Sequence, residues 1–244
     1  EVRGETATDT PSTNAVEQML DTSNTAFDVV AETAEAAEPN GFELLGLAPE
    51  LVQAVAEGMQ SDLDVVQGIW LELLTLLKDG EVDCVLGASK TPDREEFAYF
   101  SEPYREERFQ LYVRKEQAGL PFDDLKAFIG AGHKVGIVNE YFYGDEVAAL
   151  YADEAHRVKF VGAIISELNM ARLLDEEIDG LLEDSFVGAS ILRRKGLDKY
   201  IQPHSISLGA SDVYVMFSKS SVTEQQVQRF NSGLQQLRDD GSYN

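Results

Sequence analysis

The feature that most limits the fold is an alternation of short apolar runs with helical patterns that occurs twice along the chain. The first series reads strand, helix, strand, helix, strand, over residues 26–31, 47–59, 63–67, 70–78 and 82–87. The second series has the same order, over residues 133–139, 144–154, 157–162, 167–176 and 178–184. The third strands also match in sequence, since the Glu-Val-Asp of residues 81–83 answers the Glu-Ile-Asp of residues 177–179, 96 positions later. The chain therefore predicts two lobes built on one plan.

The predicted fold class is α/β, with two βαβαβ-based lobes whose sheets are mostly parallel. One extended stretch, residues 108–116, separates the two series, and another, residues 210–219, follows them. If both extended stretches cross between the lobes, the chain leaves the first lobe, builds the second and then returns to the first. We therefore expect residues 26–110 with 212–244 to form lobe I and residues 111–211 to form lobe II. Lobes joined by a pair of strands can hinge.

A final helix is predicted after the second crossing. Thr223 and Gln226 have capping-box spacing at its start, and Gly241 can stop it. Between them an apolar stripe suited to a core recurs at helical spacing.

The composition excludes several classes of partner. Acidic side chains number 44 against 20 basic ones, which gives a formal net charge of -24 over 244 residues. This charge repels phosphate backbones and anionic lipids, so no nucleic acid or membrane-surface partner is expected. Cys84 is the only cysteine and the three histidines lack metal-ligand spacing, so no disulfide, metal or other cofactor is predicted. Residues 1–25 are expected to be a polar leader or tether, from which any export signal has been removed or never existed.

In parallel sheets ligands bind beyond the carboxyl ends of the strands, which points to the segments after Leu86 and Leu182. After Leu86, the main chain of Gly87 and Ser89 is expected to offer free N–H groups, and Arg94 offers a planar fork of donors. This combination suits a carboxylate. The alternative is that Arg94 merely pairs with a neighbouring acid on a solvated turn.

The matching end of lobe II carries Glu183 and Asp184. One interpretation is that an anion there faces Arg94 across a cleft, a pair that would select a zwitterion such as an amino acid. The other is that Asp184, followed by Ser185 and an apolar run, caps the start of a helix.

Several motifs together resemble a known family. They are ELVQAVA ahead of Trp70, GEVDCVLGASKTPDREEFAYFSEPY, IDGLLED and the closing LRDDGSY, of which TPDR to FSEPY is the most specific. The chain from about Phe27 to Tyr243 resembles the family 3 extracytoplasmic solute-binding proteins of polar amino acid ABC transporters. The resemblance implies a Venus-flytrap, periplasmic binding protein type II fold.

The resemblance also implies roles for particular residues. Arg94 would bind the ligand α-carboxylate, helped by N–H groups near Gly87 and Ser89. Asp184 would bind the α-ammonium, and Trp70 would form an apolar wall of the pocket.

The chain departs from the family pattern in two places near the expected pocket. After the first strand it reads AETAEAAEPN, with Ala36 near the position of a clamping aromatic residue. Where many members open the first helix of lobe II with a Gly-Thr-Thr turn, this chain reads NEYFYG. Tyr141, or its neighbours Phe142 and Tyr143, could supply the missing aromatic surface; the alternative is a packed aromatic cluster at the hinge.

The leading functional hypothesis is a monomeric, extracytoplasmic binding protein, with a lipid tether as one option, that captures an amino acid and presents it to the membrane permease of an ABC transporter. Glu32, with Glu35 and Glu38, motivates the further expectation of a basic or polar amino acid. The alternative is a sensor domain of a receptor such as a histidine kinase, motivated by the polar leader and by the end at Asn244, where relatives usually continue. An enzyme is not predicted, because no nucleophile-base or metal spacing is present.

Overall fold

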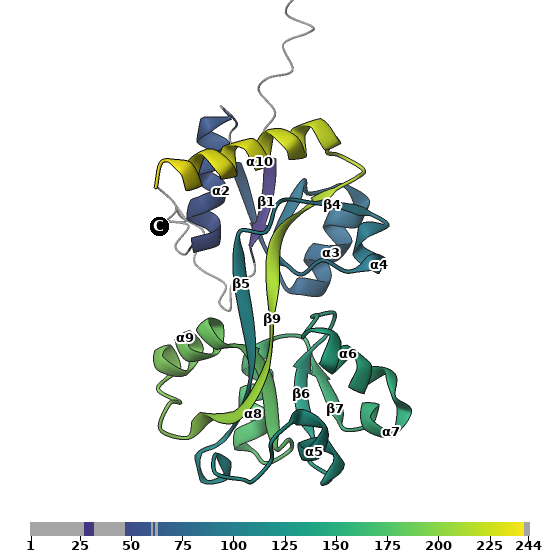
Figure 1. Cartoon of the computed structure of the whole chain (residues 1–244), viewed down its shortest axis with the longest axis vertical. Helices are drawn as coiled ribbons and strands as arrows, with labels where there is room; N and C mark the ends of the chain where they lie inside the picture. Colours follow the sequence, from purple (N-terminus) through teal and green to yellow (C-terminus); the bar gives the residue numbers. More distant parts are fainter. Residues whose placement is uncertain (1–26, 32–46, 60, 62, 242–244) are drawn as a thin grey trace, which may run out of the picture.

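Two lobes, one above the other, make up the protein, and two long strands join them (Figure 1). The joining strands run antiparallel to each other and are β5 (Arg105–Arg114) and β9 (Ile201–Ser218). The computed structural model describes residues 27–31, 47–59, 61 and 63–241.

Lobe I contains the first βαβαβ series together with the last helix (Figure 1). Its elements are β1 (Phe27–Ala31), α2 (Leu47–Gly58), β2 (Leu63–Gln67), α3 (Trp70–Asp79), β3 (Cys84–Ala88), α4 (Pro92–Glu95), β4 (Ala98–Phe100) and α10 (Glu224–Asp239). β1 pairs in parallel with both β2 and β3, whereas β9 runs antiparallel to β3 and β4.

Lobe II repeats the plan. Its elements are the 3-10 turn η1 (Lys115–Gln117), α5 (Leu125–Gly130), β6 (Val135–Val138), α6 (Asp145–Ala152), α7 (Glu154–Arg157), β7 (Phe160–Ala163), α8 (Ser166–Leu174), β8 (Gly180–Asp184) and α9 (Ser185–Lys195). β6 pairs in parallel with β7 and β8, and β8 runs antiparallel to β5. The strand order is β2-β1-β3-β9-β5-β8-β6-β7, with β4 beside β9.

The predicted α/β class and its two βαβαβ-based lobes are confirmed, since β1 pairs in parallel with β2 and β3, and β6 pairs in parallel with β7 and β8. The joining strands pair antiparallel. Some bounds differ. β9 begins at Ile201 rather than near residue 210, and β7 begins at Phe160 because α7 takes up the preceding residues. The residues at which the chain changes lobe stay a prediction.

Each lobe has its own apolar core. One buried cluster of lobe I packs α2 and α10 against the sheet through residues such as Val55, Phe217 and Phe230, and another lies under α3. In lobe II one cluster surrounds Phe128 and Leu111, and a second lies under α8 and α9. Within the described ranges, no helix combines the length and the apolar character that crossing a membrane requires.

Candidate functional site

Arg94 points inward from a short helix at the end of lobe I's third strand. The helix α4 begins after Thr91, whose hydroxyl accepts a hydrogen bond from the Arg94 N–H at 3.4 Å, and Pro92 occupies its first turn. Only 7% of the Arg94 residue is exposed, and burial lowers the pKa of its guanidinium, partly offset by the charges of Glu140 and Glu107. The alternative of a solvated ion pair is wrong for this arginine, since the neighbouring Glu95 pairs with Lys90 instead, at 2.8 Å.

The guanidinium of Arg94 spans from lobe I to lobe II. One terminal nitrogen donates to the Ser89 carbonyl at 2.7 Å, and the other donates to the Glu140 carbonyl at 2.6 Å. Glu140 lies in the loop after β6 and adopts a left-handed backbone conformation, with φ of 63°. Because such a conformation is unfavourable for a residue with a side chain, the loop holds this carbonyl in place at some cost.

Trp70, the first residue of α3, packs its ring against the guanidinium of Arg94. Its ring lies 5.2 Å from the guanidinium carbon, and its Nε1–H donates to the same Glu140 carbonyl at 3.1 Å. Tyr141 meets the edge of Trp70 with ring centroids 5.8 Å apart, and Tyr143 follows at 5.9 Å. Tyr141 and Tyr143 of the NEYFYG segment therefore belong to a packed aromatic cluster, as the alternative interpretation expected. A role for Tyr141 as a wall of the pocket stays a prediction.

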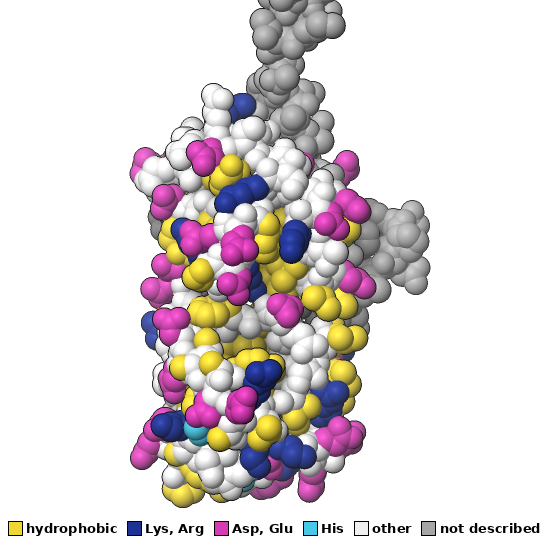
Figure 2. All heavy atoms as spheres, turned by 90° about the vertical axis from the view of Figure 1, so that its right-hand side faces the viewer, with side chains coloured by type: hydrophobic (Ala, Val, Ile, Leu, Met, Phe, Trp, Pro, Cys, Tyr) yellow, Lys and Arg dark blue, Asp and Glu magenta, His cyan; other side chains and the backbone are white. Residues whose placement is uncertain are grey.

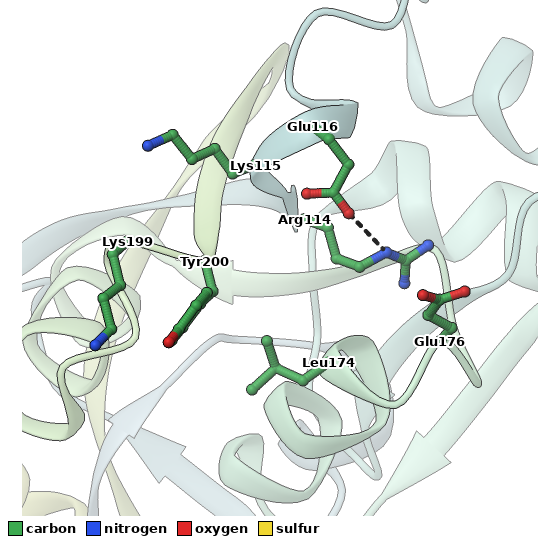
Figure 3. A pocket seen from close by; sticks show the side chains of 7 residues that line it. All are labelled: Arg114, Lys115, Glu116, Leu174, Glu176, Lys199 and Tyr200. Carbon is green, nitrogen blue, oxygen red and sulfur yellow. Dashed lines mark ion pairs between the residues drawn. The ribbon is translucent and has the colours of Figure 1, made fainter.

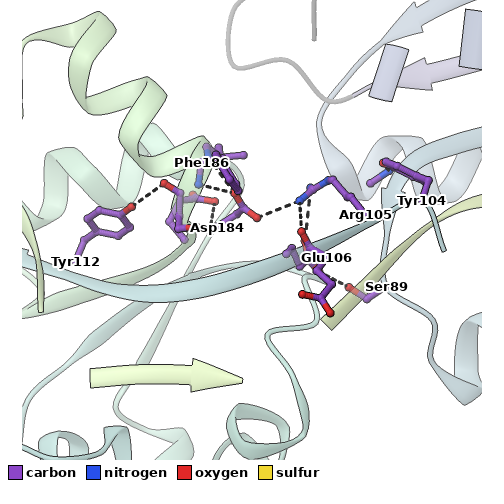
Figure 4. Close-up of polar contacts among 12 residues, drawn as sticks. Ser89, Tyr104, Arg105, Glu106, Tyr112, Asp184 and Phe186 are labelled. Atoms are coloured by element: carbon purple, nitrogen blue, oxygen red, sulfur yellow. Dashed lines mark hydrogen bonds and ion pairs between the residues drawn. The ribbon is translucent and has the colours of Figure 1, made fainter. Parts of the chain in front are cut away.

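Asp184 ends β8 and is 4% exposed. Its Oδ1 accepts the N–H groups of Phe186 at 2.8 Å and of Val187 at 3.0 Å, so the prediction that Asp184 caps the following helix is confirmed. The other oxygen, Oδ2, accepts from Arg105 at 3.3 Å (Figure 4). The cation that lies against Asp184 is therefore Arg105 and not Arg94.

Arg105 and Glu107, which sequence reasoning missed, connect the two expected binding ends. Glu107 is 5% exposed; one of its oxygens accepts from the Ser89 hydroxyl at 2.9 Å, and the other lies 3.8 Å from Arg105. Burial raises the pKa of Glu107 to about 7, although the hydrogen bond from Ser89 and the charge of Arg105 oppose this shift. A polar chain thus runs from Ser89 through Glu107 and Arg105 to Asp184.

A sequence signal for Glu107 did exist. Along a strand, alternate side chains share a face, and residue 107 is in phase with the buried Phe109, Leu111 and Val113. A carboxylate in phase with a buried face is a candidate for a specific role.

The expectation of a free Gly87 N–H is wrong, because this group donates to the Tyr104 hydroxyl at 3.1 Å. The third strand extends to Ala88, which places Gly87 inside it with φ of 77°, a conformation suited to glycine. Ser89 contacts the neighbours named above through its carbonyl and its hydroxyl. Glu32, Glu35, Ala36 and Glu38 lie outside the described residues.

A separate hollow of about 630 Å³ lies on lobe II (Figure 3). It is lined by Arg114, Lys115, Glu116, Leu174, Glu176, Lys199 and Tyr200, none of which is a predicted site residue. Arg114 donates to the carbonyls of Leu173 and Ile178 at 2.7 and 2.8 Å, so it ties α8 to β5. By contrast, Arg94 and Asp184 provide opposite charges from different lobes. Figure 2 shows hydrophobic side chains gathered across the middle of one face of the molecule.

The arrangement presents groups that suit a small molecule of mixed charge. Arg94 carries donors suited to an anionic group, Asp184 carries an acceptor suited to a cationic group, and Trp70 adds an apolar surface. Because these residues come from both lobes, relative movement of the lobes would change the distance between the two charges.

The chain is similar in sequence and fold to several known proteins. The chain is 22% identical to the arginine-binding extracellular protein ArtP of Bacillus subtilis (strain 168) over 202 residues, covering 82% of this chain and 75% of the relative. It is 26% identical to a probable histidine-binding protein of Neisseria gonorrhoeae over 211 residues, covering 81% and 71%. Among solved structures, a histidine kinase sensor domain with similarity to periplasmic binding proteins superposes with a TM-score of 0.74 at 21% identity, covering 89% and 92%.

The two-lobed fold is that of the type II periplasmic binding proteins. The model of one family, the bacterial extracellular solute-binding proteins, family 3, matches residues 26–244. The chain belongs to that family.

Proposed function

We propose that this protein captures an amino acid, or a similar small zwitterion, between its lobes by hinge closure. Arg94 binds the α-carboxylate and Asp184 binds the α-ammonium, with Trp70 beside the ligand and Gly87, Ser89 and Tyr141 around it. A ligand that contacts both lobes favours the closed state through its differential contacts, so no chemical step is required.

The observation that carries the proposal is the environment of Arg94. The guanidinium is buried and contacts two carbonyl oxygens and an aromatic ring, and within the described ranges no ion pair joins it to a carboxylate. A buried cation that lacks a paired anion is costly, and an incoming carboxylate would supply the missing charge.

We further propose a cationic or polar side chain for the ligand. The relatives described above are named for binding arginine and histidine, which supports this choice. Glu32, near the end of the first strand in sequence, is the proposed acidic contact for that side chain. Tight binding of glutamate or aspartate without any response to arginine, lysine or ornithine would exclude a basic ligand.

The proposed setting is extracytoplasmic, with the protein acting as a monomer and delivering its ligand to the permease of an ABC transporter. The family, whose members are extracellular solute-binding proteins, supports this setting. Because both lobes move toward each other on capture, a permease could distinguish the closed form by its shape.

The second candidate is a ligand-sensing domain of a receptor, which the similarity to a histidine kinase sensor domain favours. Both candidates share the ligand site and differ in the partner. Neighbouring permease and ATPase genes would favour transport, whereas a membrane helix and a signalling domain encoded in the same gene would favour sensing.

The test of the ligand site is Arg94→Ala. We screen the twenty standard amino acids and ornithine by thermal shift, then measure the best ligand by calorimetry. Loss of a buried charged partner is expected to weaken binding by at least about 100-fold. Arg94→Lys keeps the charge but loses the fork of donors, and it should also bind weakly.

The matched control is Arg108→Ala, because the Arg108 side chain is 72% exposed and should leave affinity unchanged. Circular dichroism establishes that each variant is folded. Full affinity in folded Arg94→Ala would show that the carboxylate site lies elsewhere.

A further inference from the structure

We propose that Arg105 is an internal competitor of the ligand, because its guanidinium occupies the carboxylate oxygen of Asp184 that the ligand's ammonium group must reach. Capture then exchanges one cation for another. This inference rests on the proposed function. It identifies Arg105 as a residue that lowers the apparent affinity of the site for its ligand.

The geometry of Asp184 leaves one oxygen for a cation. Oδ1 already accepts two backbone N–H groups of α9, whereas Oδ2 accepts from Arg105 at 3.3 Å. Since Asp184 is almost fully buried, a second cation has little free surface to approach. An ammonium group can therefore bind Oδ2 when the guanidinium moves away.

Arg105 has a second partner to which it can turn. Glu107 lies two residues later on the same face of β5, with an oxygen 3.8 Å from the other terminal nitrogen of Arg105. The Arg105 side chain is 23% exposed, so it also has a route towards solvent. Because a Glu107 oxygen can still accept from the guanidinium after Asp184 is released, Arg105 keeps a hydrogen-bond partner through the exchange.

The other end of the site has a parallel arrangement. The two terminal nitrogens of Arg94 donate to the carbonyl oxygens of Ser89 and Glu140, so both nitrogens that a ligand carboxylate would use are already engaged. The Glu140 carbonyl is presented by the left-handed backbone described above. The chain's own groups thus engage both charges that the ligand would use. The contact of Arg94 with Glu140 joins lobe I to lobe II, and the contact of Arg105 with Asp184 joins the hinge strand β5 to lobe II.

Competition of this kind lowers the apparent affinity of a site, because the binding-competent arrangement is populated only part of the time. Removing the competitor should strengthen binding, which is the opposite of what loss of a direct ligand contact would do. The sign of the change therefore decides between a competitor and a ligand-contacting residue.

The experiment compares Arg105→Gln with Arg108→Gln, its matched control on the same strand. The probes are L-arginine, with L-histidine as a second amino acid, and 5-guanidinopentanoate, which is arginine without the α-ammonium group. Calorimetry should show about tenfold tighter amino acid binding to Arg105→Gln, within the usual range of couplings between sites. Arg108→Gln should match the wild type, and 5-guanidinopentanoate should gain nothing from either substitution.

A double variant, Arg105→Gln with Glu107→Gln, covers the case in which the single variant does not fold, and the same gain is expected from it. The proposal would also be supported if the Arg105 variants bind an amino acid while binding by the wild type is too weak to measure. Equal or weaker amino acid binding by folded Arg105→Gln would overturn it, while wild-type binding that Arg94→Ala abolishes would leave the proposed function standing. If neither the wild type nor any variant binds an amino acid, the proposed function and this inference both fail.

Discussion

Glu107 is a buried acid at the centre of the polar chain that connects the lobes, and its environment makes stability depend on pH. Burial raises its pKa to about 7, against the opposing effects of Ser89 and Arg105. The folded protein therefore keeps a proton on this group at pH values where the unfolded chain has lost it. The stabilising contribution is complete below the unfolded pKa and is lost as the pH rises through about 7.

Glu107→Gln should remove this dependence. The variant keeps an acceptor for the Ser89 hydroxyl but cannot ionise, so it should be more stable than the wild type at pH 8 and similar to it at pH 4. From the size of the shift, the difference in unfolding free energy between the two pH values should be at most about 3 kcal/mol. Urea titrations across this range measure it.

Glu106→Gln is the control, because Glu106 lies next to Glu107 on the strand but its side chain is 65% exposed. It should follow the wild-type profile. Parallel profiles for Glu107→Gln and the wild type would mean that Glu107 ionises normally in the folded protein.

At the scale of elements, the sequence was sufficient wherever a local rule decides the structure. The helix predicted over residues 70–78, which forms as α3 with Gly80 at its C-cap, and the capping box of Thr223 and Gln226 are confirmed, because both depend on residues close together in the chain. The helices α4 and α7 were not predicted, since four residues are too few to show a helical period.

The residues of the candidate site also separate into those that local sequence rules could predict and those that they could not. Arg94 and Asp184 could be found from strand ends and from the resemblance to a family. The contact of Arg105 with Asp184 could not, because it depends on the register in which β5 meets β8, where Phe109 lies opposite Asp184. Register is a long-range property that neither strand specifies by itself.

The position of α9, which follows Asp184, depends on a close approach at Gly188. A Cβ at this position would lie 2.7 Å from three atoms of the Tyr112 ring and hydroxyl. Tyr112 also donates to the Ser185 carbonyl at 3.2 Å and so holds the start of the helix. Gly188→Ala should therefore displace α9 from β5 and lower the unfolding free energy by about 1–3 kcal/mol.

Denaturant unfolding tests this prediction, with Ser190→Ala as the exposed control on the same helix. The control should stay within about 0.5 kcal/mol of the wild type. A Gly188→Ala protein as stable as the wild type would show that α9 and β5 can separate without cost.

At the scale of the whole molecule, the formal net charge of -24 acts on both stability and binding. Acidic side chains are spread over the face in Figure 2 and are not confined to one patch. Their mutual repulsion opposes the compact state, whereas a cationic ligand is attracted from a distance.

Raising sodium chloride from 10 mM to 1 M should therefore increase the melting temperature, because screening shortens the Debye length from roughly 30 to 3 Å and weakens this repulsion. The same salt should slow the association of a cationic amino acid and affect a neutral one less. A melting temperature that falls with salt would mean that attractive ion pairs, such as Arg105 with Asp184, outweigh the repulsion.

The paired strands β5 and β9 also have a consequence for synthesis on the ribosome. The core of lobe I that contains Val55 needs Phe217 and Leu234, whereas the core of lobe II around Leu111 is complete at Leu208. The half of the molecule that begins first along the chain thus finishes last. During translation, lobe II can mature while lobe I still waits for its final strand and helix, and its unfinished sheet is the surface that a chaperone would need to shield.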